Sequence, residues 1–306
     1  MTPHHHAGLR QLSTDPTNTE GIREQFLRAV RRRFRQLRGR IRTVAGYGED
    51  RLNLKQDARL ADAEDIERFP TDTGKTRAFI DWLRDRLESG VLEPVSRKQI
   101  RDGEHWTATY IRSAYARGWE NATQRLQNEG VSVAESDREV FDLGVPAEQL
   151  RRLYARTFEN LASVTEDAAP AVRETLTQGL AEGWNPRKMA DFMSETIRTV
   201  QHTQAEVLAR TEVINSYADA TLDRFDRAGV DGATVSGEFR TAEDQDVCPI
   251  CEALNGRVYT TDEMRTATFE FDADEHPNTV PSDSGVYPVK PPTHPRCRCA
   301  VYPSIS

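Results

Sequence analysis

The chain has 306 residues, a net charge of −8 and an apolar fraction of 37 %. This length is enough for two domains, or for one domain with helical extensions, with a buried apolar core. No stretch reaches the eighteen or so apolar residues of a membrane span, and the N-terminus lacks the apolar run of a signal peptide. We therefore expect a soluble protein that has no membrane partner and is not exported by the general secretory route.

The basic residues are unusual in type and in position. Arginine supplies 36 of the 41 basic residues and lysine the other five. An acidic, lysine-poor composition suits a protein that stays hydrated in high salt, which suggests a halophilic host, although a GC-rich genome alone would also favour arginine over lysine. Residues 21–45 hold nine arginines and one glutamate, a charge of +8, which leaves −16 on the rest of the chain. The sequence thus predicts a basic segment attached to an acidic body.

The N-terminal residues divide into a tail and an arm. Residues 1–20 are polar and aperiodic, so we expect a disordered tail, in which His4-His5-His6 is solvated rather than metal-binding. In residues 21–45 the apolar residues recur in steps of three and four, which predicts an amphipathic helical arm whose apolar stripe needs a partner surface. The candidates for contact with DNA or a protein partner are Arg28, Arg31, Arg32, Arg33, Arg35, Arg38, Arg40 and Arg42.

Residues 46–71 contain glycine, proline and many acids, and are expected to form a connector. Residues 72–230 are expected to form a helical domain, with helices over about 72–89 and 96–128. In the second of these, Trp106, Tyr110, Tyr115 and Trp119 recur at helical spacing, which favours a core position over a base-stacking platform. Farther along, Asn185-Pro186 predicts a helix start, and Gly229 the end of a long helix.

After residue 230 short β-like runs alternate with turns. The pair Asn255-Gly256 favours a tight hairpin turn, and residues 272–292 form a long polar loop. We expect an α+β fold: a mostly helical body with long helices, followed by a small β-rich, zinc-stapled C-terminal module over residues 231–306.

All four cysteines lie in this module. Cys248 and Cys251 are three residues apart, and His294 stands three residues before Cys297, with Cys299 close behind. A three-residue step in a tight turn directs two ligands at one metal, and zinc takes four cysteine or histidine ligands in a tetrahedron. We predict a structural Zn²⁺ site with four of these five residues as ligands.

Three other interpretations of the cysteines remain open: disulfides, simple buried thiols, and a catalytic zinc that recruits Glu275 and His276. A structural zinc has a clear physical purpose, because a module of this size with a long polar loop buries little apolar surface. Zinc would contribute on the order of 10 kcal/mol of folding free energy and offset the entropy of closing the loop.

The motifs occur in a characteristic order. The chain contains LARTEV from residue 208, DVCPIC from residue 246, LNG from residue 254 and PPTHPRCRC from residue 291. In this order they resemble the Mu F-like phage head morphogenesis proteins, the minor head proteins of tailed viruses, over roughly residues 145–303. The resemblance implies a minor capsid protein of the virion, attached to the portal protein inside the head after assembly in the host cytoplasm. The implied roles are head assembly and DNA packaging or delivery, without an established enzymatic activity.

Within this resemblance, Arg210 and Glu212 match the helical motif, as an ion pair or buried polar contact against the zinc module or as a portal-binding contact. Further partners are the major capsid protein and packaged double-stranded DNA, bound without sequence preference through the arm. Two other functional classes stay open. One is a zinc-dependent nucleic-acid-processing enzyme or toxin-like effector, although no catalytic motif is present. The other is a DNA-binding zinc protein, which would need a reading helix beside the metal.

Overall fold

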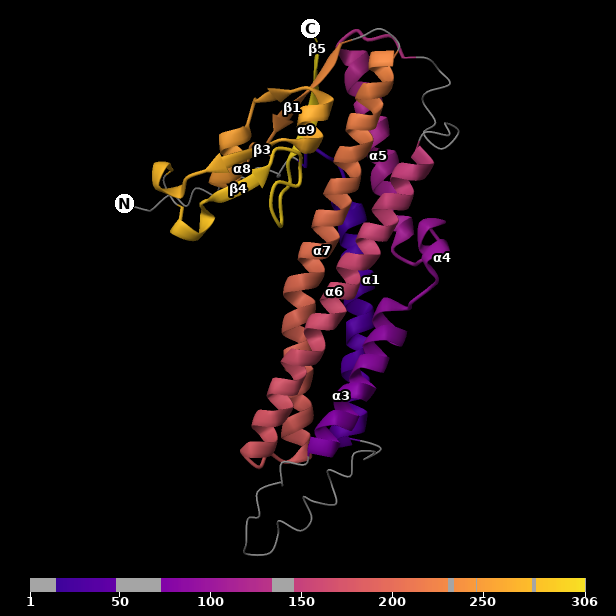
Figure 1. The fold of residues 1–306 in the computed structure, drawn as a ribbon, viewed down its shortest axis with the longest axis vertical. Helices are drawn as coiled ribbons and strands as arrows, with labels where there is room; N and C mark the ends of the chain where they lie inside the picture. Colours follow the sequence, from indigo (N-terminus) through magenta and orange to yellow (C-terminus); the bar gives the residue numbers. More distant parts are fainter. Residues whose placement is uncertain are drawn as a thin grey trace, which may run out of the picture. The chain divides into compact units, whose positions relative to one another are not determined.

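The computed structural model describes residues 15–47, 73–133, 146–230, 234–245, 247–276 and 279–305. Over these residues the fold is α+β, with long helices and a small C-terminal strand region (Figure 1). The chain forms two compact units. The helical unit comprises Gly21–Tyr115 and Glu139–Ser216, and the mixed unit comprises Met1–Glu20, Ala116–Arg138 and Tyr217–Ser306. The expected domain ranges of 72–230 and 231–306 differ from these units because α5 (Ala108–Asn128) and α7 (Pro186–Val230) contribute to both.

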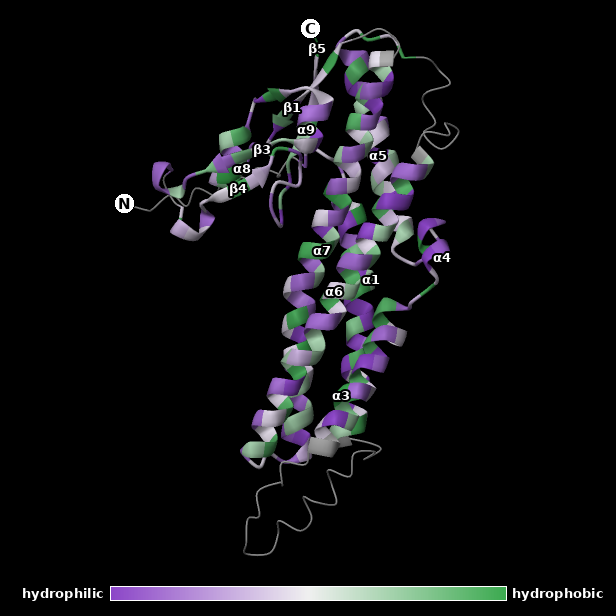
Figure 2. Ribbon diagram, in the orientation of Figure 1, coloured by the Kyte–Doolittle hydropathy of each residue, from purple (hydrophilic) through white to green (hydrophobic). Residues whose placement is uncertain are grey.

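The helical unit is made of amphipathic helices, along which apolar and polar residues alternate (Figure 2). Its apolar side chains are fully buried on several helices, for example Phe79, Leu83, Leu161 and Ile197. No helix in the described part of the chain is both long enough and apolar enough to cross a bilayer. The elements of this unit, besides parts of α5 and α7, are α1 (Glu20–Arg42), η1 (Thr43–Tyr47), α3 (Thr73–Leu87), η3 (Glu88–Leu92), α4 (Arg97–Arg101) and α6 (Pro146–Ala181).

Helix α1 corresponds to the segment expected to be a basic arm, and its apolar stripe is covered by the protein itself. Phe26, Val30, Phe34 and Ile41 are fully buried. The ring of Phe26 stacks on that of Tyr110, with 4.9 Å between the ring centroids. Within the helical unit α1 is therefore an integral helix, and its stripe has the partner surface that the sequence required.

The described residues begin at Asp15, before α1. The carboxylate of Asp15 accepts hydrogen bonds from the backbone N–H groups of Thr19 and Glu20, at 3.0 and 2.9 Å. Thr17 and Thr19 are buried. The expectation of a disordered tail is therefore wrong for residues 15–20, whose short polar side chains satisfy the free backbone donors at the helix start. His4-His5-His6 and most of the 46–71 connector lie outside the described residues.

Two helix boundaries differ from the prediction. The expected helix over 96–128 is broken into α4 and α5 around Gly103, which has a φ of 76° that ends α4 as a left-handed cap. The long helix does not end at Gly229, because α7 continues to Val230. At the other end of α7, the prediction from Asn185 is confirmed: its side-chain oxygen accepts the Lys188 N–H at 2.9 Å.

The mixed unit contains two antiparallel sheets, one with strand order β2-β1-β5 and one that pairs β3 with β4. Strand β1 pairs with β5 from Val235↔Ile305 to Arg240↔Ala300, so the last strand of the chain closes this sheet. The elements are β1 (Val235–Arg240), α8 (Pro249–Leu254), β2 (Val258–Tyr259), α9 (Thr261–Thr266), β3 (Thr268–Phe271), η5 (Ala273–Glu275), η6 (Pro281–Asp283), β4 (Gly285–Pro288) and β5 (Ala300–Ile305).

The larger of two apolar clusters in the mixed unit joins its helices to its strands. It joins Leu126 of α5 and Phe225 of α7 to Phe239 of β1, Leu254 of α8 and Val301 of β5. Three of the cysteines, at positions 251, 297 and 299, are buried in the same cluster. The strand region therefore does not rely on its own apolar surface alone, because the ends of two long helices belong to its core.

Candidate metal centre

The first half of the centre is built by the start of α8. Cys248 is the N-cap residue, and its Sγ accepts the backbone N–H of Cys251 at 3.4 Å. Pro249 occupies the first helical position, where its missing N–H costs nothing. The cap hydrogen bond brings Cys248 close to Cys251, so that both thiols lie on one side of the start of α8.

The second half is a turn that leads into β5. The Cys297 N–H donates to the His294 carbonyl at 3.2 Å, and Arg296 adopts a positive φ of 69° inside this turn. Cys299 directly precedes Ala300, which pairs with Arg240 of β1. Strand pairing therefore holds the second group of ligands next to the first.

The two halves are also linked by polar contacts. Arg298 and Asp244 form two hydrogen bonds, each 2.6 Å long, in the fork geometry that suits a guanidinium and a carboxylate. The side-chain oxygen of Asn255 accepts the Thr241 N–H at 3.2 Å, and the Gly256 N–H donates to the Phe239 carbonyl at 2.8 Å. The pair of Arg298 with Asp244 joins the turn before β5 to the loop before α8. The other two contacts hold the loop after α8 against the end of β1.

The hairpin expected at Asn255-Gly256 is wrong in one respect. The pair joins α8 to β2 rather than two strands, although Gly256 has the expected positive φ of 79°. Helix α8 itself was missed because CPICEAL is too short to show a helical period. A short helix therefore lies beside the cysteines, together with strands and loops.

All five predicted donors converge. His294 Nε2 lies 3.0 Å from the Sγ atoms of both Cys248 and Cys251. The Sγ atoms of Cys251 and Cys297 are 3.8 Å apart. Two groups of three donors have their ligand atoms within 4.8 Å of one another, Cys248 with Cys251 and His294, and Cys251 with Cys297 and Cys299. Cys251 belongs to both groups and is the common point of the cluster.

The donor set fits zinc. A tetrahedron with Zn–S bonds of about 2.3 Å has S–S edges of about 3.8 Å, which matches the Cys251–Cys297 separation, whereas the two N–S distances are those of hydrogen bonds. The donors surround a hollow of about 30 Å³, which is the size of a single ion or water. His294 Nδ1 lies 2.7 Å from the Pro295 carbonyl, an arrangement that places the ring proton on Nδ1 and leaves the Nε2 lone pair facing the thiols.

The five donors lie close enough to shift one another's pKa in both directions. Hydrogen bonding from Cys251, helped by His294, lowers the pKa of Cys248 to about 4. Burial disfavours the charged imidazole, but the thiolates at Cys248 and Cys297 outweigh it and raise the pKa of His294 to about 9. Hydrogen bonding to its cysteine neighbours raises the pKa of Cys251. A bound cation would displace the protons that the raised pKa values keep on His294 and Cys251.

The alternatives for the cysteines can now be compared with the geometry. All four are free thiols, and the 3.8 Å between the Cys251 and Cys297 sulfurs is far from a disulfide bond of about 2.05 Å. For the catalytic alternative, neither Glu275 nor His276 lines the hollow. The His276 ring instead stacks on Phe271, with 4.5 Å between centroids.

The LARTEV motif lies on α7 within the helical unit. Glu212 is fully buried and accepts hydrogen bonds from Asn160 Nδ2 at 2.8 Å and Thr157 Oγ1 at 3.1 Å, both on α6. Arg156 lies 3.5 Å from the same carboxylate. Arg210 pairs with Glu206 one helical turn away, at 3.4 Å. Of the expected contacts, the motif makes a helix ion pair and a buried polar contact, but the buried contact is with α6 and not with the zinc module.

The eight arginines of α1 that were candidates for contact with DNA or a protein fall into different environments. Arg33 is committed to the helical unit, since its guanidinium lies 3.8 Å from the Trp106 ring centre and its Nε lies 2.9 Å from Glu93. Arg31 and Arg38 are half-buried. The exposed members are Arg28, Arg32, Arg35, Arg40 and Arg42.

Sequence reasoning missed the charged residues that anchor the mixed unit. Lys290 pairs with the buried Asp219 of α7. Arg265 of α9 lies 2.9 Å from Asp223 and 2.6 Å from Asp226. These three aspartates recur at steps of four and three, which places them on one side of α7. This acidic stripe is the sequence pattern from which the ion pairs could have been predicted.

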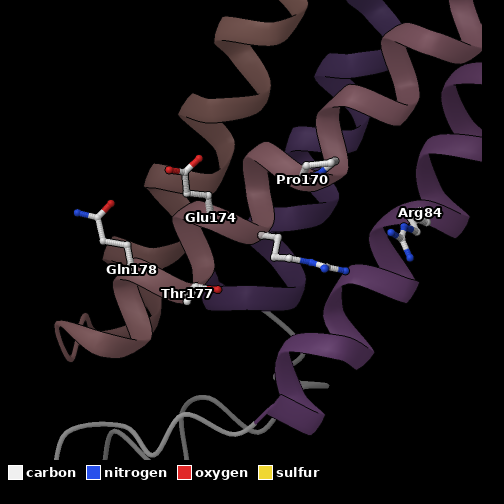
Figure 3. A pocket seen from close by; sticks show the side chains of 6 residues that line it. Arg84, Pro170, Glu174, Thr177 and Gln178 are labelled. Carbon is white, nitrogen blue, oxygen red and sulfur yellow. The ribbon is translucent and has the colours of Figure 1, made fainter.

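A larger groove, of about 480 Å³, lies in the helical unit between Arg84 of α3 and residues 170–178 of α6 (Figure 3). Glu174 and Gln178 point away from Arg84 (Figure 3). The lining contains neither histidine nor cysteine and a single carboxylate. This groove therefore has no set of convergent groups that would perform catalysis.

The comparisons with known proteins give one result. Residues 170–302, which are less than half of the chain, match the family model described as Phage Mu protein F like protein. The match includes α7, both cysteine-containing segments and the first part of β5. It supports a Mu F-like phage protein. No curated protein and no solved structure matches the chain.

Proposed function

We propose that this protein is a minor head protein of a tailed phage, which acts in head morphogenesis at the portal vertex inside the capsid. The observation that carries the proposal is the match to the Phage Mu protein F like family over residues 170–302. The matched segment contains the whole candidate metal centre, so the feature with the clearest chemistry belongs to the part of the chain that the family shares.

The role is structural rather than enzymatic. Structural zinc sites are closed by four protein ligands, whereas catalytic sites keep one position open for water or substrate. Five protein donors surround one small hollow here, which favours a closed site. The metal would hold α8 and the segment before β5 together and so keep the C-terminal strands on their helices.

The partners follow from this assignment. The protein would assemble in the host cytoplasm, bind the portal protein and contact the major capsid protein, and would remain in the virion. The α7 helix and the zinc-bound module are the parts that we assign to head assembly, and from there to DNA packaging and delivery.

The experiment is quantitative mass spectrometry of purified virions from the phage that carries the gene, with the lysate measured in parallel. We expect the protein in virions at a few copies per portal ring, and co-purification with the portal protein when the two are expressed together. Complementation with Cys251→Ser should reduce incorporation, whereas Glu206→Ala, a change at a partly exposed position of α7, should not. A protein that is abundant in lysates but missing from virions would contradict the proposal.

A further inference from the structure

Helix α1 carries a continuous band of arginine opposite its buried side. Arg28, Arg32, Arg35 and Arg42 follow at steps of four, three and seven, which places them within one side of a helix. The same periodicity puts the buried apolar stripe of α1 on the opposite side. Arg31 and Arg38 flank this band, and Arg198 of α7 adjoins it through Arg38. We call these seven residues the arginine face.

The charge of this face is only partly balanced. Glu24 pairs with Arg28 at 3.1 Å, Asp191 with Arg42 at 3.7 Å, and Glu195 binds Arg198. Seven arginines against three carboxylates leave a net charge of +4. Among the ion pairs of the described residues, those of α1 involve Arg28, Arg33 and Arg42, and none involves Arg32 or Arg35.

Like charges crowd one another at the C-terminal end of the face. Burial, together with the positive charges of Arg42 and Arg198, lowers the pKa of Arg38, and Glu195 opposes this only in part. A bound anion would relieve that repulsion.

The kind of partner follows from what the face lacks. Protein interfaces are usually anchored by apolar or aromatic side chains that are exposed in the free protein. The exposed large apolar residues in the described part of the chain all lie outside α1: Phe192, Val258, Val280, Val286 and Ile305. Because the apolar stripe of α1 is already buried within the helical unit, the side chains that the helix exposes are polar or charged, and most of them are guanidinium groups.

Those groups suit a nucleic-acid backbone. The planar guanidinium binds phosphate through two parallel hydrogen bonds. At a rise of 1.5 Å per residue, the fourteen steps from Arg28 to Arg42 span about 21 Å, the rise of about six base pairs in B-form DNA. A duplex supplies regularly spaced phosphates over that length.

We propose that the arginine face binds the phosphate backbone of double-stranded DNA without reading its sequence. This site is separate from the metal centre, and the proposal does not depend on the assignment to the phage head. No base-reading contacts are required, because the band consists of side chains that recognise charge and phosphate geometry.

The test uses the full chain and two duplexes of unrelated sequence, with binding followed by fluorescence anisotropy between 50 and 200 mM salt. Four outward arginines that each contact a phosphate give a slope of about −3.6 in log K against log salt. Over that range the affinity should fall roughly a hundredfold, and equally for both duplexes. The variant Arg28→Gln, Arg32→Gln, Arg35→Gln, Arg42→Gln keeps good helix formers and should flatten the slope towards zero.

A matched control removes the same charge from other helices of the unit: Arg84→Gln, Arg101→Gln, Arg152→Gln and Arg173→Gln. It should keep the affinity and the salt slope, and the corresponding four-lysine variant of the face should keep most of the slope. Circular dichroism establishes that each variant is folded. The proposal is overturned if the wild type does not bind duplex DNA, or if the control loses as much affinity as the face variant. It is also overturned if the face variant binds DNA unchanged but no longer binds the portal protein.

Discussion

The buried carboxylate of Glu212 offers the sharpest test of how the helical unit is held together. It is fully buried and accepts hydrogen bonds from Thr157 and Asn160, while Arg156 approaches it from the solvent side. Each hydrogen bond to a charged acceptor contributes about 1.5–3 kcal/mol. The ion pair with the half-exposed Arg156 adds at most about 1 kcal/mol because solvent screens it.

The change Glu212→Ala should therefore lower the free energy of unfolding of the helical unit by about 3–5 kcal/mol, because it leaves a buried amide and hydroxyl without an acceptor. Glu212→Gln retains one acceptor oxygen and should cost about half as much. The assay is urea denaturation followed by circular dichroism. A double-mutant cycle of Glu212→Ala with Asn160→Ala should give a coupling energy of about 1.5–3 kcal/mol.

The matched control is Glu206→Ala, which lies on the same helix and removes the partly exposed pair with Arg210. It should cost less than about 1 kcal/mol. If Glu212→Ala were no more destabilising than this control, or if the coupling to Asn160 were absent, the reasoning about the buried network would be refuted.

Two other predictions concern packing and pH. Gly118→Ala would place a Cβ 2.3 Å from the Tyr217 carbonyl oxygen, so it should destabilise the mixed unit by about 1–3 kcal/mol in thermal denaturation, and an unchanged midpoint would contradict the close helix contact. Burial lowers the pKa of His105, whose Nε2 lies 2.6 Å from the Leu92 carbonyl and whose Nδ1 accepts from Thr107. The unfolded chain therefore takes up this proton first, so the stabilisation is present above about pH 6.5 and is lost as the pH falls through the folded value, by at most about 1.4 kcal/mol per pH unit. The difference between the urea midpoints at pH 7.5 and pH 5.5 should be smaller in His105→Asn than in the wild type. An equal difference in both proteins would show that His105 is not the source of the pH dependence.

The convergence of the metal donors could be predicted because it depends on local rules. A three-residue step places two side chains together in any tight turn. Two such pairs within one small module are therefore expected to lie close together in the folded chain. The structure adds that Cys251 is shared by both groups of donors. The sequence could not show this, because the sharing depends on α8, a helix of six residues.

The contacts between residues far apart in the sequence were harder to predict. Periodicity predicted the apolar stripe of α1, but not that Phe26 would pack on Tyr110, because a stripe does not encode which surface covers it. Glu212 makes a buried polar contact with Thr157 and Asn160 of α6, and the sequence did not indicate this partner helix. The break at Gly103 was missed because apolar spacing continues across it, whereas the backbone turns there with a positive φ.

The metal content of the purified full-length chain tests the central claim most directly. Native mass spectrometry of protein prepared without chelators should show one zinc per chain. Cys251→Ser should strongly weaken zinc binding, because that thiol lies in both groups of donors. Zinc removal should also lower the thermal stability of the mixed unit. A wild-type chain that carries no zinc and unfolds at the same temperature with and without chelator would contradict the account.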